Sequence, residues 1–339
     1  MPVHRRDRGA AAALAALFVF ASCSGSVRTT GNPSTALPNS PGTSVGPVPS
    51  GPQPLGDHLV AQIQVDNMPC ALAFDTASGW ATGYRDGTID RFDVATNKVT
   101  AHIDIGGRPC GIAVGPDGRI WVADLIGARV VAIDPVAQKV SASIGSLSSA
   151  LWDLKSGFGS VWVVDRTNQM LLRIDPVSAT ITKQIPIGPM GSGLAVTAKA
   201  VWVADALDGT IRRIDPATNT ATVTATINGG AIWFADDAKT RLGVGGTQGG
   251  PLTILDPESG TVKATVNGWV AIRDGTVIGN QAWIPDGGSA DVIVVDLDTG
   301  KITTRYALPQ TGNPFVAEVA GGDVFVEDFG GSLIWRIRP

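Results

Sequence analysis

The sequence predicts an all-β protein, a seven-bladed β-propeller of four-stranded blades, and three observations lead to this prediction. The first is a phrase centred on an aspartate, which recurs every 40 or 41 residues at Asp93, Asp134, Asp175, Asp215, Asp256 and Asp296. The second is a phrase centred on a tryptophan, which runs ahead of the first at Trp80, Trp121, Trp162, Trp202 and Trp283. The third is length, because residues 58–339 give room for seven units of about 40 residues.

Each repeated unit reads as four short strands. In the second unit they are expected over residues 111–115, 120–124, 128–135 and 139–145. Apolar and polar residues alternate there, and Asp-Pro and Asp-Gly pairs separate the runs, which indicates strands joined by hairpin turns. Four strands in a unit of about 40 residues are typical of a propeller blade. No run shows convincing helical periodicity, so helices are expected to be scarce.

The last blade is expected to be closed by the N-terminal strand of the ring. The final repeat stops after its third strand, at residues 332–339. Its missing fourth strand is found at residues 59–65 (LVAQIQV), which resemble the outer strand at residues 99–105 (VTAHIDI). Pairing of the two would remove the exposed edges that an open ring would leave.

Residues 1–23 read as a targeting segment that ends at the cysteine to be lipidated. Three arginines precede an apolar run over residues 10–21, which is too short to span a bilayer. The small residues around Cys23 resemble a bacterial lipoprotein signal, which implies diacylation of this cysteine and stable anchoring to the cell membrane. An ordinary secretory signal with an incidental cysteine is the alternative.

Residues 24–57 are expected to form a disordered tether, and residues 58–339 the propeller. The tether is rich in Ser, Thr, Pro and Gly, and it lacks the apolar surface needed to offset the entropy of ordering. The whole chain has a formal net charge of −4. Such an acidic balance gives no electrostatic drive toward nucleic acid, so nucleic-acid partners are excluded.

The blade phrases resemble two related groups of bacterial propellers. PCGIAVGPDG at residues 109–118, together with WVAD and IDPxT, resembles the YVTN-type repeat family and the propeller of the virginiamycin B lyase type. The resemblance covers about residues 66–339 and implies the fold rather than an activity. Lyases of this type use a histidine and an acid at the channel mouth. Here His58 and His102 are both assigned to outer strands, so the resemblance does not extend to lyase activity.

Polar residues that depart from the repeat are the candidates for a binding site. Asp153 and Glu318 are assigned to innermost strands, at positions where other blades carry Ala113 or Ala195. A water-filled channel that tolerates such residues without function is the alternative. The full set of candidate ligand-binding residues is Asp153, Glu318, Arg273, Asp274, Arg108, Trp152 and Trp269.

Other acids and aromatics follow the repeat, so they are expected to build blades. The periodic tryptophans are expected to pack between neighbouring blades. The recurring strand-end acids are expected to accept hydrogen bonds from the turns that follow them, rather than to bind a cation. These acids are Asp124, Asp165, Asp205, Asp286 and Asp328.

Cys70 and Cys110 occupy the same repeat position in adjacent blades. In an exported protein they could form a disulfide, and otherwise they are small core hydrophobes. A catalytic thiol is disfavoured because no histidine is expected nearby.

The function expected from the sequence is a monomeric binding module of the bacterial cell envelope. Its partner would be an envelope protein or a small ligand, and no cofactor or metal is expected. The alternative is an envelope hydrolase or lyase that uses Asp153, Glu318 and Asp274 at the channel mouth as metal ligands or general base. A structural stabiliser of a larger envelope complex is a third possibility.

Overall fold

The computed structural model describes residues 51–339, apart from residue 229, residues 247–248 and residues 310–311. This part of the chain forms 29 strands and one short 3-10 helix, η1 (Gly56–His58), so the all-β prediction is confirmed. In the described part, no helix is both long enough and apolar enough to cross a membrane.

Five sheets have four strands each. The first contains β3 (Pro69–Phe74), β4 (Ser78–Gly83), β5 (Thr88–Asp93) and β6 (Lys98–Asp104). The second contains β7 (Pro109–Val114), β8 (Ile120–Asp124), β9 (Arg129–Asp134) and β10 (Lys139–Ile144). The third contains β11 (Leu151–Gly157), β12 (Ser160–Asp165), β13 (Met170–Asp175) and β14 (Thr180–Pro186). The fourth contains β15 (Gly191–Val196), β16 (Val201–Asp205), β17 (Thr210–Asp215) and β18 (Thr220–Thr226). The fifth contains β27 (Pro314–Ala320), β28 (Asp323–Asp328), β29 (Leu333–Ile337) and β2 (Leu59–Gln64).

The sixth sheet has nine strands, where the repeat predicts two separate blades. One part is β19 (Ala231–Asp236), β20 (Leu242–Gly246), β21 (Leu252–Leu255) and β22 (Val262–Val266). The other part is β23 (Gly275–Ile278), β24 (Gln281–Asp286), β25 (Asp291–Asp296) and β26 (Lys301–Ala307), with β1 (Gln53–Pro54) on its outer edge. A short parallel pairing joins the two parts, with Ala235 opposite Gly275 and Asp236 opposite Thr276.

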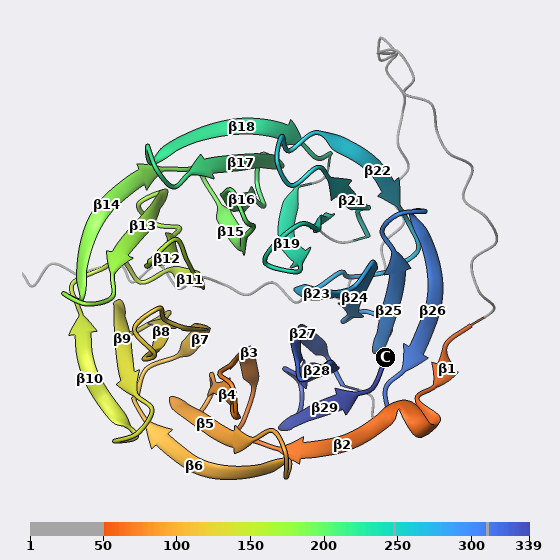
Figure 1. The fold of residues 1–339 in the computed structure, drawn as a ribbon, viewed down its shortest axis with the longest axis horizontal. Helices are drawn as coiled ribbons and strands as arrows, with labels where there is room; N and C mark the ends of the chain where they lie inside the picture. Colours follow the sequence, from red (N-terminus) through yellow and green to blue (C-terminus); the bar gives the residue numbers. More distant parts are fainter. Residues whose placement is uncertain (1–50, 229, 247–248, 310–311) are drawn as a thin grey trace, which may run out of the picture. The chain divides into compact units, whose positions relative to one another are not determined.

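The sheets stand around a common axis (Figure 1). The innermost strands β3, β7, β11, β15, β19, β23 and β27 contact one another in this order, and β27 contacts β3 in turn. The ring is closed as predicted, because β2 pairs antiparallel with β29, with Leu59 opposite Ile337 and Gln64 opposite Leu333.

The ring's packed segment begins before the expected boundary at residue 58. Gln53 and Pro54 pair with Tyr306 and Ala307 of β26, and Leu55 is 3% exposed within a core cluster. Leu55 is the one large apolar side chain in this stretch, so its burial accounts for the early start. The expected signal segment, the lipidation site Cys23 and the tether up to residue 50 lie outside the described residues.

The repeated residues build the frame, as the sequence predicts. The periodic tryptophans are at most 1% exposed and belong to the core clusters of the ring. The strand-end acids accept hydrogen bonds from nearby backbone N–H groups. Asp124, for example, accepts from Arg108 and Gly127 at 2.8 Å. Each such acid joins the turn after its own strand to the segment that enters the sheet, which holds the innermost strands in place.

Candidate functional site

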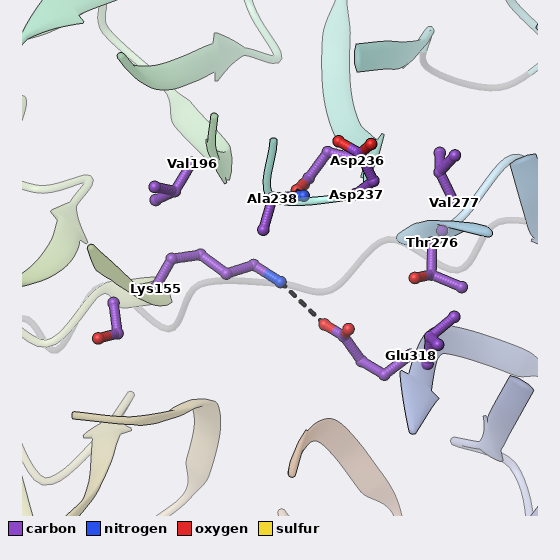
Figure 2. Close-up of a pocket in the computed structure, with 11 residues that line it drawn as sticks. Lys155, Val196, Asp236, Asp237, Ala238, Thr276, Val277 and Glu318 are labelled. Carbon is purple, nitrogen blue, oxygen red and sulfur yellow. Dashed lines mark hydrogen bonds and ion pairs between the residues drawn. The ribbon is translucent and has the colours of Figure 1, made fainter. Parts of the chain in front are cut away.

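A charged cluster lies where the innermost strands face the axis. Lys155 on β11 and Glu318 on β27 extend toward each other, and the Lys155 Nζ atom lies 3.1 Å from Glu318 Oε1 (Figure 2). A second carboxylate, Asp274, lies 3.8 Å from the same nitrogen through Oδ2. We call the following residues the axial cluster: Lys155, Asp153, Asp236, Asp274, Glu318 and Glu327.

Lys155 is a stable cation within this cluster. Burial on its own would lower the pKa of the Lys155 amine, but the carboxylates of Glu318, Asp274, Asp153 and Asp236 together raise that pKa well above its usual value. The ammonium is therefore charged at neutral pH, and it serves as a counter-ion rather than as a nucleophile.

Several acids of the cluster retain protons more strongly than usual. Burial raises the pKa of Asp236 to about 7, although Lys155 opposes the shift. Burial also raises the pKa of Asp274 well above its usual value, and the neighbouring carboxylates of Asp153 and Glu318 raise it further. One ammonium does not balance this many carboxylates, so protons supply the missing positive charge.

Glu327 on β28 is the most enclosed member of the axial cluster. The residue is 0% exposed, and neither of its carboxylate oxygens has a hydrogen-bond partner among the described residues. Burial raises the pKa of Glu327 well above its usual value, and the negative charges of Asp274 and Glu318 add to the shift. An unpartnered buried carboxyl is costly to a fold, which marks this position as a candidate for function.

Asp153 belongs to the cluster but has a structural role as well. Its Oδ1 accepts the backbone N–H of Leu154, and its Oδ2 accepts that of Leu194, both at 2.7 Å. The second bond joins β11 to β15. Burial raises the pKa of Asp153, opposed by Lys155 and by these two donors. With both oxygens occupied, Asp153 is poorly placed to act as a general base.

A cavity of about 320 Å³ adjoins the cluster, at the end of the ring where the innermost strands finish. It is bounded by charged and hydroxyl groups as well as by apolar side chains. Figure 2 shows Lys155 and Glu318 meeting beside it, with Asp236, Asp237 and Thr276 on neighbouring elements. We call it the axial cavity, and its polar lining residues are Lys155, Ser156, Asp236, Asp237, Thr276 and Glu318.

Aromatic side chains gather at the other end, where the innermost strands begin. Trp233 lies 6.2 Å from Trp152 and 5.1 Å from Phe315, measured between ring centroids. Phe329 continues the series at 5.1 Å from Phe315 and 5.9 Å from Tyr84. We call these five residues the aromatic rim. The indole Nε1 of Trp233 is buried and has no hydrogen-bond partner among the described residues.

Arginines cover the aromatic rim. The guanidinium carbon of Arg166 lies 3.6 Å from the ring centroid of Trp152. Arg108 lies 5.4 Å from Tyr84, and Arg273 lies 5.5 Å from Phe315. At these distances each cation is attracted to the aromatic face. The rim is therefore positively charged, whereas the axial cluster beneath it is acidic.

Cys70 and Cys110 form a disulfide beside the rim, with 5.0 Å between their Cα atoms. Of the two alternatives left open by the sequence, the structure has the disulfide. It joins the innermost strands β3 and β7 and packs in one cluster with Phe329. The bridge thereby fixes the spacing of two sheets directly under the aromatic rim.

Most of the predicted site residues meet at the axis, but Trp269 does not. Asp153, Asp274 and Glu318 lie in the axial cluster, and the other candidates apart from Trp269 lie at the rim. Trp269 is 8% exposed in a hydrophobic cluster with Ile272, and its indole N–H donates to the Gly250 carbonyl at 2.6 Å. It departs from the repeat because it fills a core space, so it is unavailable to a ligand.

One assignment of strand position is also corrected. Ala113 and Ala195 pair with the repeated tryptophans of their sheets, and in β11 the residue in this position is Lys155 rather than Asp153. The register shift between Leu151 and Leu154 in β11 has an exact counterpart between Gly191 and Leu194 in β15. Lys155 is therefore in step with Ala195, and Asp153 was matched to the wrong repeat position. Lys155 was missed for this reason, and it occupies the place that Glu318 has on β27.

Asp236 and Glu327 were missed as well. Asp236 and Glu327 each occupy a position at which other repeat units carry small or apolar residues. In the repeat, Glu327 falls where other sheets have Ala123 or Ala204, directly before the recurring acid. That departure was the signal that could have identified it.

The two histidines that the structure describes lie away from the axis, as expected. His58 is in η1, one residue before β2 rather than within the outer strand, and its Nδ1 lies 2.7 Å from the Arg338 carbonyl oxygen. His102 is on the outer strand β6. The axial cluster therefore has no imidazole among its described residues.

Comparisons with known proteins identify the fold. No family model matches the chain, and no curated protein matches it in sequence. A virginiamycin B lyase from Staphylococcus aureus is similar in structure, with a TM-score of 0.73 and 13% identity over 82% of this chain and 98% of that one. A streptogramin B lyase has a TM-score of 0.71 and 12% identity, covering 82% and 96% of the two chains. Hydrazine synthase from Kuenenia stuttgartiensis has a TM-score of 0.68 and 14% identity, covering 82% and 97%. At these identities the likeness shows a β-propeller fold and no activity.

Proposed function

We propose that the protein is an exported, lipid-anchored β-propeller that binds a small, positively charged ligand, such as an amine, in its axial cavity. We count seven blades, taking β19–β22 and β23–β26 as two, because each set matches one unit of the sequence repeat. The observation that carries the proposal is the excess of carboxylates over cations in the axial cluster.

Charge balance favours a cationic ligand. Four carboxyl groups act on the Lys155 ammonium, and burial raises the pKa values of two of them, Asp236 and Asp274, and of Glu327 beside them. A bound cation would replace protons on these acids, and it would interact with them in surroundings of low dielectric, where Coulombic attraction is strong. Polar groups on several strands around a cavity are typical of small-molecule sites.

A proton-exchanging enzyme is the second candidate. Asp236 favours it, because a carboxyl group with a pKa of about 7 can donate and accept protons near neutral pH. The occupied oxygens of Asp153 disfavour its part in the version expected from the sequence, in which Asp153, Glu318 and Asp274 are metal ligands or general base. The binding module therefore remains the first proposal.

Calorimetric titration of the full chain in detergent would test the ligand class. The panel contains 1,3-diaminopropane, choline, propionate and glycerol, which separate cations from anions and neutral polyols. We expect only the cations to bind, and Glu318→Gln to weaken binding at least about tenfold because it removes a lining charge. Glu258→Gln is the matched control, since Glu258 is exposed and pairs only with Lys199.

The pH dependence of the same titration sharpens the test. Cations should bind more tightly as pH rises through about 7, because Asp236 then releases its proton. Asp236→Asn should flatten this dependence. Binding of propionate or glycerol alone, or equal losses in the Glu258→Gln and Glu318→Gln variants, would refute the proposed ligand class.

The anchoring proposal has its own experiment. Cys23→Ala should move the protein from the membrane fraction to the soluble fraction, since it removes the acceptor of the acyl chains. Fractionation of cells followed by immunodetection would measure this. A variant that stays in the membrane fraction after a high-salt wash would show that Cys23 is not the anchor.

A further inference from the structure

A second group of chemically versatile side chains lies outside the axial cluster, where the closing strand leads into the first sheet. Asp66 follows β2, Asp90 is on β5 and His102 is on β6. Asp90 and His102 are directly opposite each other in the pairing of β5 with β6. The backbone N–H of Asp66 donates to Asp90 Oδ2 at 2.6 Å, which holds the third residue against the other two.

The three side chains converge on one point. His102 Nδ1 lies 2.6 Å from Asp90 Oδ1 and 3.4 Å from Asp66 Oδ2. One ligand atom from each residue lies within 4.8 Å of the other two. A zinc ion bonds to nitrogen and carboxylate oxygen at about 2.0–2.2 Å, so tetrahedral ligand atoms lie roughly 3.3–3.6 Å from one another. Small side-chain rotations would complete the arrangement.

Burial sets this group apart from an ordinary surface ion pair. The side chain of Asp90 is 1% exposed, whereas those of Asp66 and His102 are 27% and 60% exposed. The corresponding place holds Val131 on β9 and Leu172 on β13, and polar residues on β17 and β21, namely Arg212 and Thr253. A carboxylate buried to this extent is costly unless a cation or hydrogen bonds compensate it.

The protein supplies little compensation of its own. Among the described residues, no lysine or arginine forms an ion pair with Asp66 or Asp90, and only His102 contacts both. Thr88 donates its hydroxyl to Asp66 Oδ2 at 2.8 Å and orients that carboxylate. Two carboxylates therefore share one imidazole, and the exposed side of the group is open to water.

We propose that Asp66, Asp90 and His102 bind a divalent transition-metal cation, with Zn²⁺ as the probe of choice. Imidazole nitrogen with carboxylate oxygen suits zinc, manganese, cobalt and nickel better than it suits calcium or magnesium. Water completes the coordination on the solvent side. Binding displaces the proton between His102 and the carboxylates, and it neutralises the buried charge of Asp90.

The location gives the metal a structural consequence. Val65, next to Asp66, donates its backbone N–H to the Ser332 carbonyl at 2.9 Å. Val65 is thereby tied to the fifth sheet, which contains β2 and β29. Asp90 and His102 belong to the first sheet. A cation held by all three joins the two sheets where the ring closes. Because the unfolded chain lacks this arrangement, binding stabilises the folded protein by mass action.

The test uses chelator-treated full-length protein, titrated with ZnCl₂ by calorimetry and followed in parallel by thermal unfolding. We expect one tight site per chain and a rise of several degrees in the melting temperature. His102→Ala and Asp66→Asn should each lower the zinc affinity at least about tenfold and abolish the rise. Both residues are partly exposed, so these variants should still fold, which the melt without zinc would verify.

His58→Ala is the matched control, because His58 is the other histidine in the described chain and lies outside the group. It should bind zinc as the unmodified protein does. Absorption by bound Co²⁺ gives a second readout. The unmodified protein and the His58→Ala variant should show a visible band, and the His102→Ala and Asp66→Asn variants should not. Absence of a stoichiometric site, or equal zinc binding in the His102→Ala and His58→Ala variants, would overturn the proposal.

Discussion

Two groups of buried carboxylates in this propeller, the strand-end acids and the acids of the axial cluster, differ in their hydrogen bonding. At the strand ends, the repeated acids are surrounded by donors. Asp286 accepts the backbone N–H groups of Val270, Ala271 and Gly288 at 2.8–3.1 Å. In the axial cluster, Glu327 is as fully buried, but neither of its oxygens has a hydrogen-bond partner in the part of the chain that the structure describes.

This difference in hydrogen bonding distinguishes acids that stabilise the fold from acids that are costly to it. Hydrogen bonds from backbone N–H groups stabilise a buried carboxylate and orient the segments that supply the donors. Glu327 receives no such bond among the described residues, and burial raises the pKa values of Glu327, Asp274 and Asp236. Groups retained despite such a cost are candidates for function.

The largest expected effect comes from removing the only ammonium of the axial cluster. Lys155→Met should lower the free energy of unfolding by about 3–5 kcal/mol at pH 8, because breaking a buried ion pair leaves uncompensated charge. At pH 5 the loss should be smaller, since Asp236, Asp274 and Glu327 then hold protons. Thermal unfolding at both pH values measures this. An equal loss at both would contradict the view that the carboxylates of the axial cluster outnumber its cations.

Removal of a strand-end acid should be nearly as costly, but without the same pH dependence. Asp286→Ala leaves three backbone donors without their acceptor, at about 1 kcal/mol or more for each. We expect a loss of roughly 3 kcal/mol by denaturant titration. The exposed acid Asp298 provides the control, and Asp298→Ala should change stability little.

The smallest effect should have the opposite sign. Burial keeps the pKa of Glu327 above its ordinary value of 4.5, so the folded state holds a proton that the unfolded state releases above that pH. Stability therefore falls as pH rises beyond about 4.5. Glu327→Gln removes this fall and should stabilise the protein at pH 8 by about 1 kcal/mol or more. A Glu327→Gln variant less stable than the unmodified protein at pH 8 would contradict the claim that Glu327, unlike the strand-end acids, is costly to the fold.

The repeat allowed much of the fold to be predicted, because each unit carries its own strand and turn signals. The pairing of β2 with β29 could be predicted because the sequence of β2 matches that of another outer strand. The joining of two units into a nine-stranded sheet could not be predicted from the repeat. It depends on a close approach at Gly275, where an added Cβ would lie 2.9 Å from the Trp283 carbonyl oxygen and 3.1 Å from the Ala235 Cβ.

The site was predicted only in part, because the sequence does not state directly which residues of the innermost strands face the axis. Asp153 and Glu318 were found because they interrupt a repeated apolar pattern. Lys155 was overlooked because Asp153 was matched with Ala195, although the position seven residues before the repeated tryptophan holds Lys155 in β11 and Ala195 in β15. The charge balance that makes the cluster notable depends on which side chains meet, so it required the structure.

The closing pair β2 and β29 also bears on the order in which the ring assembles. Leu59 and Ile337 are opposite each other although nearly the whole propeller lies between them in sequence. Contacts of such long range carry the largest loop-closure cost, so they are expected to form late, after the local hairpins. Until then the nascent ring has two bare strand edges, which favour pairing with a second copy. The chain would thus be most prone to aggregation just before the ring closes.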